Sequence, residues 1–254
     1  AQQIDKERTM ARRTRPVRGV RAEAATVASP HIRRVLPFYD PLDEAQVEKL
    51  EAQVDWMIEN IGVAFRDDPV ALEIWRKAGI EPTGEHGDLI KADAQFIRDL
   101  VAKAPSQFVQ HARNPERSVT IGGNHQVFAP IYGAPFVRDL EKGRRYAEFD
   151  DYEKLLKLVY MHPNLHHGSF VICEPTDIPV SKRHLDMVFA QMTLSDKPFL
   201  GAITEMSRAQ DTVDMIDNLF GAERLDSDVC IMANVNTNSP LLVDRVVRDR
   251  KSTR

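Results

Sequence analysis

From Asp150 onward the chain alternates between helix-forming and strand-forming segments, and this alternation limits the fold more than any other feature of the sequence. Amphipathic helical patterns occupy residues 150–161, 181–195 and 206–221. The near-continuous apolar runs between and after them are "GSFVICE" at 168–174, "PFLGAIT" at 198–204 and "DVCIMANV" at 228–235. Serial units of strand and helix joined by short turns predict a parallel sheet, because parallel strands need crossover connections. Such apolar runs are typical of strands that helices cover.

The ends of these helices carry capping signals. Asp150 or Asp151, Ser181 and Ser207 each have a side-chain oxygen that can accept a hydrogen bond from the first helical turn. Gly221 follows the last helical pattern, where glycine commonly ends a helix. We therefore expect the helices to begin and end at these residues.

Two α/β architectures are compatible with this pattern. A doubly wound nucleotide-binding sheet usually has a glycine-rich turn after its first strand, but the chain contains no GxGxxG or GxxxxGK[ST] motif. The adjacent glycines of "TIGGNH" at 120–125 precede no helical pattern and are typical of a tight hairpin turn. A (β/α)8 TIM barrel instead collects polar residues after its strands. Such residues follow the three apolar runs: Glu174, Thr204, Glu205, Asn234 and Asn236. We therefore favour a (β/α)8 TIM-barrel type, truncated because too few units are present to close it.

The residues before Asp150 predict a different region. Helical patterns run over 43–61, with Asp43 as N-cap and Gly62 as the stop, over 68–79, and over 93–104 before Pro105. Short apolar runs separated by Gly and Pro follow at 118–140 and predict strands. The expected organisation is a basic arm at 1–36, a helical and β-hairpin entry region at 37–149, and the incomplete first half of the barrel at 150–254.

Charge is unevenly distributed along the chain. The net charge is −4, yet the first 21 residues are rich in Lys and Arg. No aromatic residues are interleaved there and no nucleic-acid-binding motif follows, so we expect an arm that wraps the surface or packs on a sister subunit rather than a nucleic-acid interface. No stretch approaches the roughly 20 apolar residues that span a bilayer. With only Cys173 and Cys230 present, we expect no disulfide framework and a cytoplasmic protein.

The adjacent pair His166 and His167, followed by Glu174, has the ligand types of a zinc or iron site. If 168–174 is extended, however, Glu174 lies roughly 20 Å beyond the histidines at about 3.3 Å per residue. Adjacent residues of an extended segment also point to opposite sides. We therefore expect the histidines to pack and hydrogen-bond rather than to share a metal with Glu174, which remains a candidate functional residue.

Three longer phrases carry a resemblance to a known family: "ARNPERSVTIGGNHQVFAPIYGAPFVRDL", "PNLHHGSFVICEPTDIPVSKRHLDMVFAQMTLSDKPFLGAIT" and "NVNTNSPLLVD". They resemble the trimethylamine methyltransferase family, corrinoid-dependent amine methyltransferases that include non-pyrrolysine glycine betaine demethylases. The resemblance covers the chain from about Pro37 to Asp244. It implies a (β/α)8 barrel in proteins about twice this long, of which this chain holds the N-terminal region and roughly half the barrel.

The same resemblance implies transfer of a methyl group from a methylated amine to the cobalt of a corrinoid. The corrinoid is carried by a separate small protein and is not bound tightly by this chain, and the enzyme itself is expected to form homo-oligomers. Binding a methylated ammonium group requires aromatic faces and negative charge. The candidate aromatic residues that could surround the cation are Tyr132 and Phe136, and the candidate counter-charges are Glu174 and Glu205. Thr204, Asn234 and Asn236 are candidates for orienting the substrate. No catalytic residue is identified.

Each candidate also has a structural alternative. Tyr132 and Phe136 are residues that often pack in a hairpin or core, and Glu174 is placed where it could cap a helix or form a salt bridge. Two other functions stay open: a metal-dependent TIM-barrel lyase or hydrolase that uses Glu174, Glu205 and a histidine, and a non-catalytic half-barrel that only binds a subunit or partner.

Overall fold

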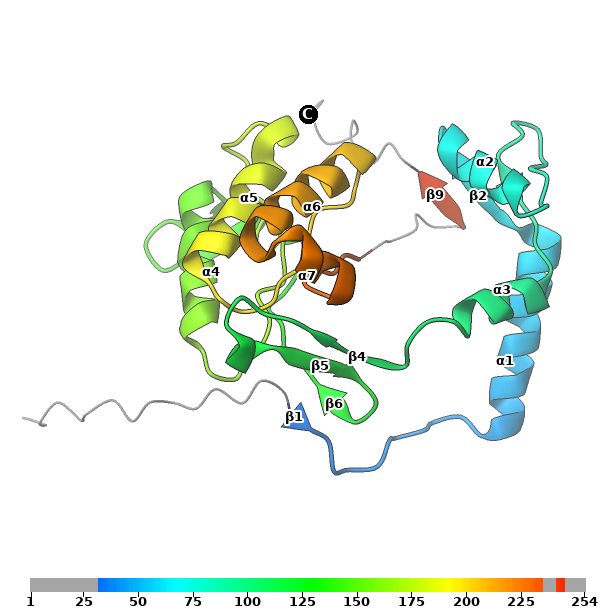
Figure 1. Cartoon of the computed structure of the whole chain (residues 1–254), viewed down its shortest axis with the longest axis horizontal. Coiled ribbons are helices and arrows are strands. Elements are labelled where there is room, and N and C mark those ends of the chain that lie inside the picture. The colour runs from blue at the N-terminus through cyan, green and yellow to red at the C-terminus, as the bar shows by residue number, and fades with distance from the viewer. Residues whose placement is uncertain (1–31, 235–240, 245–254) are drawn as a thin grey trace, which may run out of the picture.

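The computed structural model describes residues 32–234 and 241–244 (Figure 1). Its helices form two groups. Four of them lie side by side: α4 (Phe149–Met161), α5 (Val180–Leu194), α6 (Met206–Phe220) and α7 (Ala222–Ser227). The others lie on the opposite side of the molecule: α1 (Glu44–Trp56), α2 (Pro69–Lys77) and α3 (Ala94–Val101). Within the described ranges no helix is long and apolar enough to cross a membrane.

The N-terminal helices follow their sequence signals. The Asp43 carboxylate accepts a hydrogen bond from the backbone N–H of Gln46, and the Gln46 side chain accepts one from Asp43 N–H. A single π-helical turn, η1 (Met57–Ile61), extends α1 to Gly62. Gly62 adopts φ 81°, and a Cβ there would lie 2.4 Å from the carbonyl oxygen of Ile90. The predicted start and stop of this helix are therefore confirmed.

The regular strands form three small sheets. A four-stranded antiparallel sheet has the order β1 (Ile32–Arg33), β6 (His125–Gln126), β5 (Val119–Gly122) and β4 (Gln107–Gln110). A second sheet pairs β2 (Val63–Arg66) with antiparallel β3 (Leu89–Ile90) and parallel β9 (Leu242–Asp244). A two-stranded hairpin joins β7 (Phe136–Asp139) to β8 (Gly143–Tyr146). The hairpin turn expected in "TIGGNH" lies between β5 and β6 and is confirmed.

The parallel sheet expected from Asp150 onward is not formed as regular strands in the described residues. We call the three apolar runs the extended segments. The first two are largely buried, whereas Val229 of the third is 40% exposed, and the runs carry two isolated parallel bridges, Leu200 to Met232 and Gln110 to Val229. The first segment adjoins the second through the hydrogen bond from Leu200 N–H to the Ser169 carbonyl. Ser169 adopts φ 58°, which takes the backbone out of the extended region and interrupts a ladder at that point. The fold is a mixed α/β arrangement, and no closed barrel is present in the part of the chain described.

The main core lies between α4, α5 and α6 and the three extended segments. The fully buried side chains at its centre are Tyr152 and Leu156 of α4, Val188 of α5 and Ile216 of α6. Cys173, Phe170, Ile172, Phe199 and Cys230 face them from the extended segments. Each large apolar side chain buried there contributes about 1.5–3 kcal/mol, so this core, rather than the interrupted sheet, holds the segments together.

The helix N-caps predicted in this half were wrong by two or three residues. The N-caps of α4, α5 and α6 are Glu148, Pro179 and Glu205, so Asp150, Asp151, Ser181 and Ser207 lie inside the helices. At α4 the reason is visible, because Asp151 reaches back and accepts a hydrogen bond from the Glu148 N–H at 2.9 Å. From the third helical position, its carboxylate therefore provides a hydrogen-bond acceptor for a backbone N–H group at the start of the helix. The end of α6 at Gly221, φ 87°, is confirmed.

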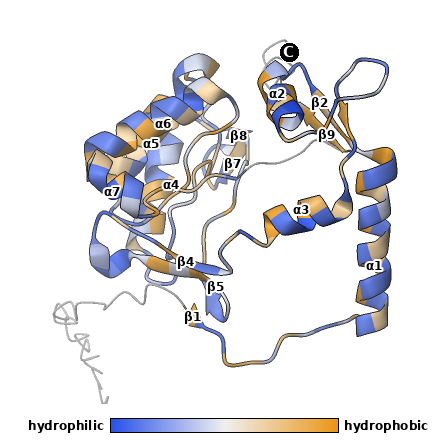
Figure 2. Cartoon of the chain, turned by 45° about the vertical axis from the view of Figure 1, so that its right-hand side comes forward, coloured by the Kyte–Doolittle hydropathy of each residue, from blue (hydrophilic) through white to orange (hydrophobic). Residues whose placement is uncertain are grey.

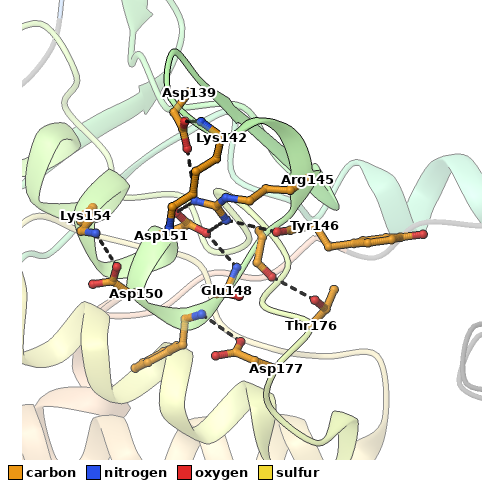
Figure 3. Close-up of polar contacts among 12 residues, drawn as sticks. Asp139, Lys142, Arg145, Tyr146, Glu148, Asp150, Asp151, Lys154, Thr176 and Asp177 are labelled. Carbon is orange, nitrogen blue, oxygen red and sulfur yellow. Dashed lines mark hydrogen bonds and ion pairs between the residues drawn. The ribbon is translucent and has the colours of Figure 1, made fainter.

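An arginine on the β7–β8 hairpin fixes the start of α4 (Figure 3). Arg145 donates two hydrogen bonds to the Asp151 carboxylate, one of them at 2.6 Å, and contacts Asp139 at 3.4 Å. These bonds hold the pKa of Asp151 down, to about 2. The Phe149 N–H donates to the carboxylate of Asp177 at 2.9 Å, which ties the loop before α5 to the same point.

We expect Asp151→Asn to lower the free energy of unfolding by about 2 kcal/mol at pH 7, because the folded-state pKa lies below the ordinary carboxyl value. The contribution is fully present above the unfolded-state pKa and is lost as the pH falls from about 4 to 2. Urea denaturation at several pH values measures it. The matched control is Asp150→Asn, an exposed carboxylate of the same turn that pairs with Lys154. Equal losses in both variants would contradict the assignment.

Candidate functional site

Two of the predicted substrate-binding residues lie on neighbouring backbone segments. The Gly133 N–H donates to the Val171 carbonyl at 2.7 Å, and the Glu174 N–H donates to the Ala134 carbonyl at 2.9 Å. This pairing brings the segment that carries Tyr132 alongside the segment that ends in Glu174. The Tyr132 residue is 46% exposed, and partial burial raises the pKa of its hydroxyl. An aromatic ring and a carboxylate thus come from adjacent chain segments at the carboxyl end of the first extended run.

Glu174 forms an ion pair. Its carboxylate accepts a hydrogen bond from Arg183 Nη1 at 2.6 Å, and Arg183 Nη2 donates to the Ile178 carbonyl at 3.2 Å. Both side chains are largely buried, with 29% of the Glu174 side chain and 14% of the Arg183 side chain exposed. The salt bridge, one of the two structural alternatives for Glu174, is therefore present. Arg183 fixes the orientation of the carboxylate and balances its charge.

The second extended run ends in a similar arrangement. Arg208 Nη1 donates to the Thr204 hydroxyl at 3.2 Å, and Arg208 Nε lies 3.7 Å from the Glu205 carboxylate. Glu205 is also the N-cap residue of α6. At the third run, Asn234 is exposed just beyond the bridge between Leu200 and Met232, whereas Asn236 lies outside the described residues.

Phe136 has a packing role in the hairpin. Its ring lies 4.6 Å from the ring of Tyr146, measured between centroids, and the guanidinium of Arg144 lies 3.7 Å over its face. The ring face is thus already used by a cation of the protein itself. This is the structural alternative that the sequence left open for Phe136.

The paired histidines are buried and hydrogen-bonded. His166 Nδ1 accepts from the Phe128 N–H at 3.0 Å. His167 Nδ1 accepts from the Ser169 N–H at 2.9 Å, so the proton is on Nε2, which lies 3.0 Å from the side-chain oxygen of Gln110. Burial lowers the pKa of His167 to about 4 and keeps the ring neutral at pH 7. The expected packing and hydrogen bonding of this pair is confirmed, and the described residues contain no group of three or more His, Cys, Asp or Glu arranged to hold a metal.

Sequence reasoning missed the two arginines of the site. Arg183 lies in the first turn of α5 and Arg208 in the first turn of α6, so the polar residues that end the first two runs meet an arginine from the helix that follows. The signal was present in the sequence as an arginine shortly after the end of each of the first two runs. It could have been found by asking which cation each carboxylate would meet once the next helix folded back.

A cavity of about 550 Å³ lies elsewhere, between β2 and the start of α2. Arg66, Asp67, Asp68, Leu72, His86 and Asp88 contribute to its lining. Two of its acids have structural partners, since Asp68 accepts from the Ala71 N–H at the α2 N-terminus and Asp88 lies 3.5 Å from Arg66. None of the predicted substrate-binding residues lines it.

Comparison with known proteins adds an independent finding. The sequence model of a family described as trimethylamine methyltransferase matches residues 8–252, which include all seven predicted substrate-binding residues. A glycine betaine methyltransferase of Desulfitobacterium hafniense (strain Y51) is 36% identical over 212 residues, which are 83% of this chain and 43% of that relative. The chain therefore spans less than half the length of this relative.

Proposed function

Because this chain belongs to the trimethylamine methyltransferase family, we propose that the protein moves a methyl group from a methylated tertiary or quaternary amine to the cobalt of a corrinoid. The corrinoid is a co-substrate in this proposal, carried by a separate small protein that docks on the enzyme. The similarity to a glycine betaine methyltransferase across 83% of the chain is the observation that carries the proposal. It favours a quaternary amine as the methyl donor.

The chemistry sets a limited task for the protein. The bond between nitrogen and the methyl carbon breaks, a bond between cobalt and that carbon forms, and the amine leaves with the electron pair. The reduced corrinoid supplies the nucleophile. A quaternary ammonium departs as a neutral tertiary amine and needs no proton from the enzyme, whereas a tertiary amine must react in its protonated form so that it departs as a neutral secondary amine. The protein therefore has to bind the cation, align it and exclude water.

Tyr132 and Glu174 fit the binding part of this task best. A partly exposed aromatic ring offers a face to a cation, a contact that contributes about 0.5–2 kcal/mol. The Glu174 carboxylate is proposed to share its negative charge between Arg183 and the bound cation, and the hydrogen bond from Arg183 orients it. Glu205 is proposed as a second counter-charge, and Thr204, Asn234 and Asn236 are proposed to orient polar groups of the substrate. Phe136 is proposed to pack within the β7–β8 hairpin beside the site, and its ring is not proposed to bind the substrate cation.

We also propose a (β/α)8 barrel of which residues 150–254 form the first units. Support comes from the order of the extended segments, since the run at 168–174 adjoins the run at 198–204, which adjoins the run at 228–235. Neighbours in sequence are thus neighbours in space, as in a barrel, and α4, α5 and α6 pack along one side of them (Figure 1). Residues 1–36 and 37–149 are proposed as the arm and the entry region, with β4 contacting the third run through Gln110 and Val229.

We expect Glu174→Gln to weaken binding of a quaternary amine about fivefold, or roughly 1 kcal/mol. The substitution removes the counter-charge and leaves the Arg183 guanidinium uncompensated beside the bound cation. Isothermal titration calorimetry with glycine betaine measures the affinity. Glu153→Gln is the matched control, because Glu153 pairs with a lysine on α4 and lies outside the proposed site. Unchanged affinity in a folded Glu174→Gln protein would remove this residue from the site.

The reaction itself is tested by following the conversion of a cobalt(I) corrinoid to its methylated form in the presence of an amine. The absorbance change reports formation of the carbon–cobalt bond directly. It distinguishes methyl transfer from amine binding alone, which calorimetry would also detect.

A further inference from the structure

Both carboxylates that are proposed to bind the substrate cation are already paired with an arginine. Glu174 lies 2.6 Å from Arg183, and Glu205 lies 3.7 Å from Arg208. All four side chains are less than a third exposed, so water screens their charges less than it screens those of a surface pair. The other candidate substrate-binding residues are uncharged. The two pairs therefore add no net charge to the described part of the site.

A site of balanced charge suits a substrate that is itself a zwitterion. A purely cationic amine such as choline would bring an unbalanced positive charge close to two guanidinium groups. An amino-acid betaine carries a carboxylate close to its ammonium group, so it can meet a glutamate with one charge and an arginine with the other. Such a substrate needs an arginine whose donors are not already used.

The two arginines differ in how many of their donors are used. A guanidinium group has five N–H donors. Arg183 donates to the Glu174 carboxylate at 2.6 Å and to a backbone carbonyl at 3.2 Å. Among the described residues, Arg208 makes one side-chain hydrogen bond, to the Thr204 hydroxyl at 3.2 Å, and its separation of 3.7 Å from Glu205 is too long for another. Arg208 therefore keeps more donors for a further anion.

Arg208 also lies near the part of the site that is proposed to bind the cation. The Leu200 N–H donates to the Ser169 carbonyl, and Glu205 and Glu174 each follow that contact by five residues along their own segments. The helices that come next, α5 and α6, lie side by side in both views (Figure 1, Figure 2). Neighbouring extended segments are about 4.8 Å apart, a distance that a small zwitterion can bridge.

Helix stability alone does not explain an arginine at this position. Arg208 lies in the first turn of α6, at the positive end of the helix dipole, where a cation is disfavoured. Its ion pair with Glu205 is long, and pairs of that kind contribute little to stability.

We propose that Arg208 binds the carboxylate of a betaine substrate, beside the Thr204 hydroxyl, while Tyr132 and Glu174 contact the ammonium group. Arg208 is thereby the residue that determines specificity for zwitterionic amines over purely cationic ones. The inference rests on the proposed function, which supplies the amine substrate, and adds the group that recognises the second charge of that substrate.

Isothermal titration calorimetry with glycine betaine and choline tests this assignment, because the two ligands share a trimethylammonium group and only the first carries a carboxylate. The protein expressed from its complete gene should bind glycine betaine more tightly than choline. Arg208→Gln should weaken binding of glycine betaine at least about tenfold and should not weaken binding of choline. Arg208→Lys, which retains the positive charge, should recover part of the affinity for glycine betaine.

Arg76→Gln is the matched control. Arg76 forms the same kind of pair with a glutamate three residues earlier, Glu73, at 3.6 Å, but it lies on α2 outside the proposed site. This substitution should leave both affinities unchanged.

Two results would overturn the role of Arg208: equal weakening for both ligands in Arg208→Gln, or equally tight binding of both ligands by the wild type. Either result would leave the proposed amine binding and methyl transfer standing. A wild-type protein that binds neither ligand would instead contradict the proposed function, and the inference with it.

Discussion

Lys197→Met is expected to lower the free energy of unfolding by about 3 kcal/mol. The Lys197 ammonium is 4% exposed and donates three hydrogen bonds to backbone carbonyls at the end of α4 and just beyond it: Val159 at 2.7 Å, His162 at 3.0 Å and Leu165 at 2.6 Å. Burial lowers the pKa of Lys197 to about 8, so the group is still charged at pH 7. Methionine fills the same space but donates no hydrogen bond. The Leu165 carbonyl then loses its lysine donor, and the Val159 and His162 carbonyls keep only backbone donors at 3.3 Å, which is costly for carbonyls in a buried setting.

Urea denaturation at pH 7 measures this loss. The control is Lys182→Met on α5, an exposed lysine for which a change below about 0.5 kcal/mol is expected. If the two substitutions lower the free energy of unfolding equally, the three hydrogen bonds of Lys197 do not stabilise the end of α4.

The second large effect is a loss of stability in mild acid. Burial lowers the pKa of His167 to about 4, against an ordinary value near 6.5, because the neutral ring is held by Gln110 and Ser169. In this pH range the unfolded chain binds a proton that the folded chain excludes. The contribution of the neutral ring is therefore complete above about pH 6.5 and is lost as the pH falls towards 4, by about 3 kcal/mol in total.

Denaturation between pH 7 and 4 in the wild type and in His167→Gln tests this assignment. The variant should be less stable at pH 7 and should lose much less stability on acidification. His86→Gln changes an exposed histidine, and its free energy of unfolding should depend on pH as that of the wild type does. If the free energy of unfolding of His167→Gln falls with decreasing pH as steeply as that of the wild type, other groups cause the acid sensitivity. The contribution of Asp151 to the free energy of unfolding is lost in a separate pH range, below about pH 4.

Features set by neighbouring residues could be predicted from the sequence. The capping box at Asp43, the glycine stops at Gly62 and Gly221 and the hairpin at "TIGGNH" each depend on residues within a few positions of one another. Their physical causes, a side-chain acceptor or a positive φ, are visible in the local sequence. The pattern of α4, α5 and α6 was predicted for the same reason.

Features set by long-range contacts could not be predicted. The sequence did not reveal that Ser169 would turn out of the extended region, because the His167 ring that accepts from its N–H is itself held by Gln110, which is distant in the chain. The N-cap of α4 was misplaced because Arg145, on the β7–β8 hairpin, positions Asp151. In the candidate site, Glu174 was identified from its place after an apolar run, but its arginine partner and its pairing with the segment after Tyr132 arise only when the chain folds.

The central claim is methyl transfer, and the most direct test uses the protein expressed from its complete gene with reduced cobalamin or its corrinoid protein. Glycine betaine and trimethylamine are supplied in turn, and the absorbance of the cobalt(I) and methylated corrinoids is followed. We expect a methylated amine to convert the cobalt(I) corrinoid to its methylated form, and glycine betaine to be a better methyl donor than trimethylamine. Absence of the methylated corrinoid with each amine, from protein that is folded and binds these amines, would contradict it.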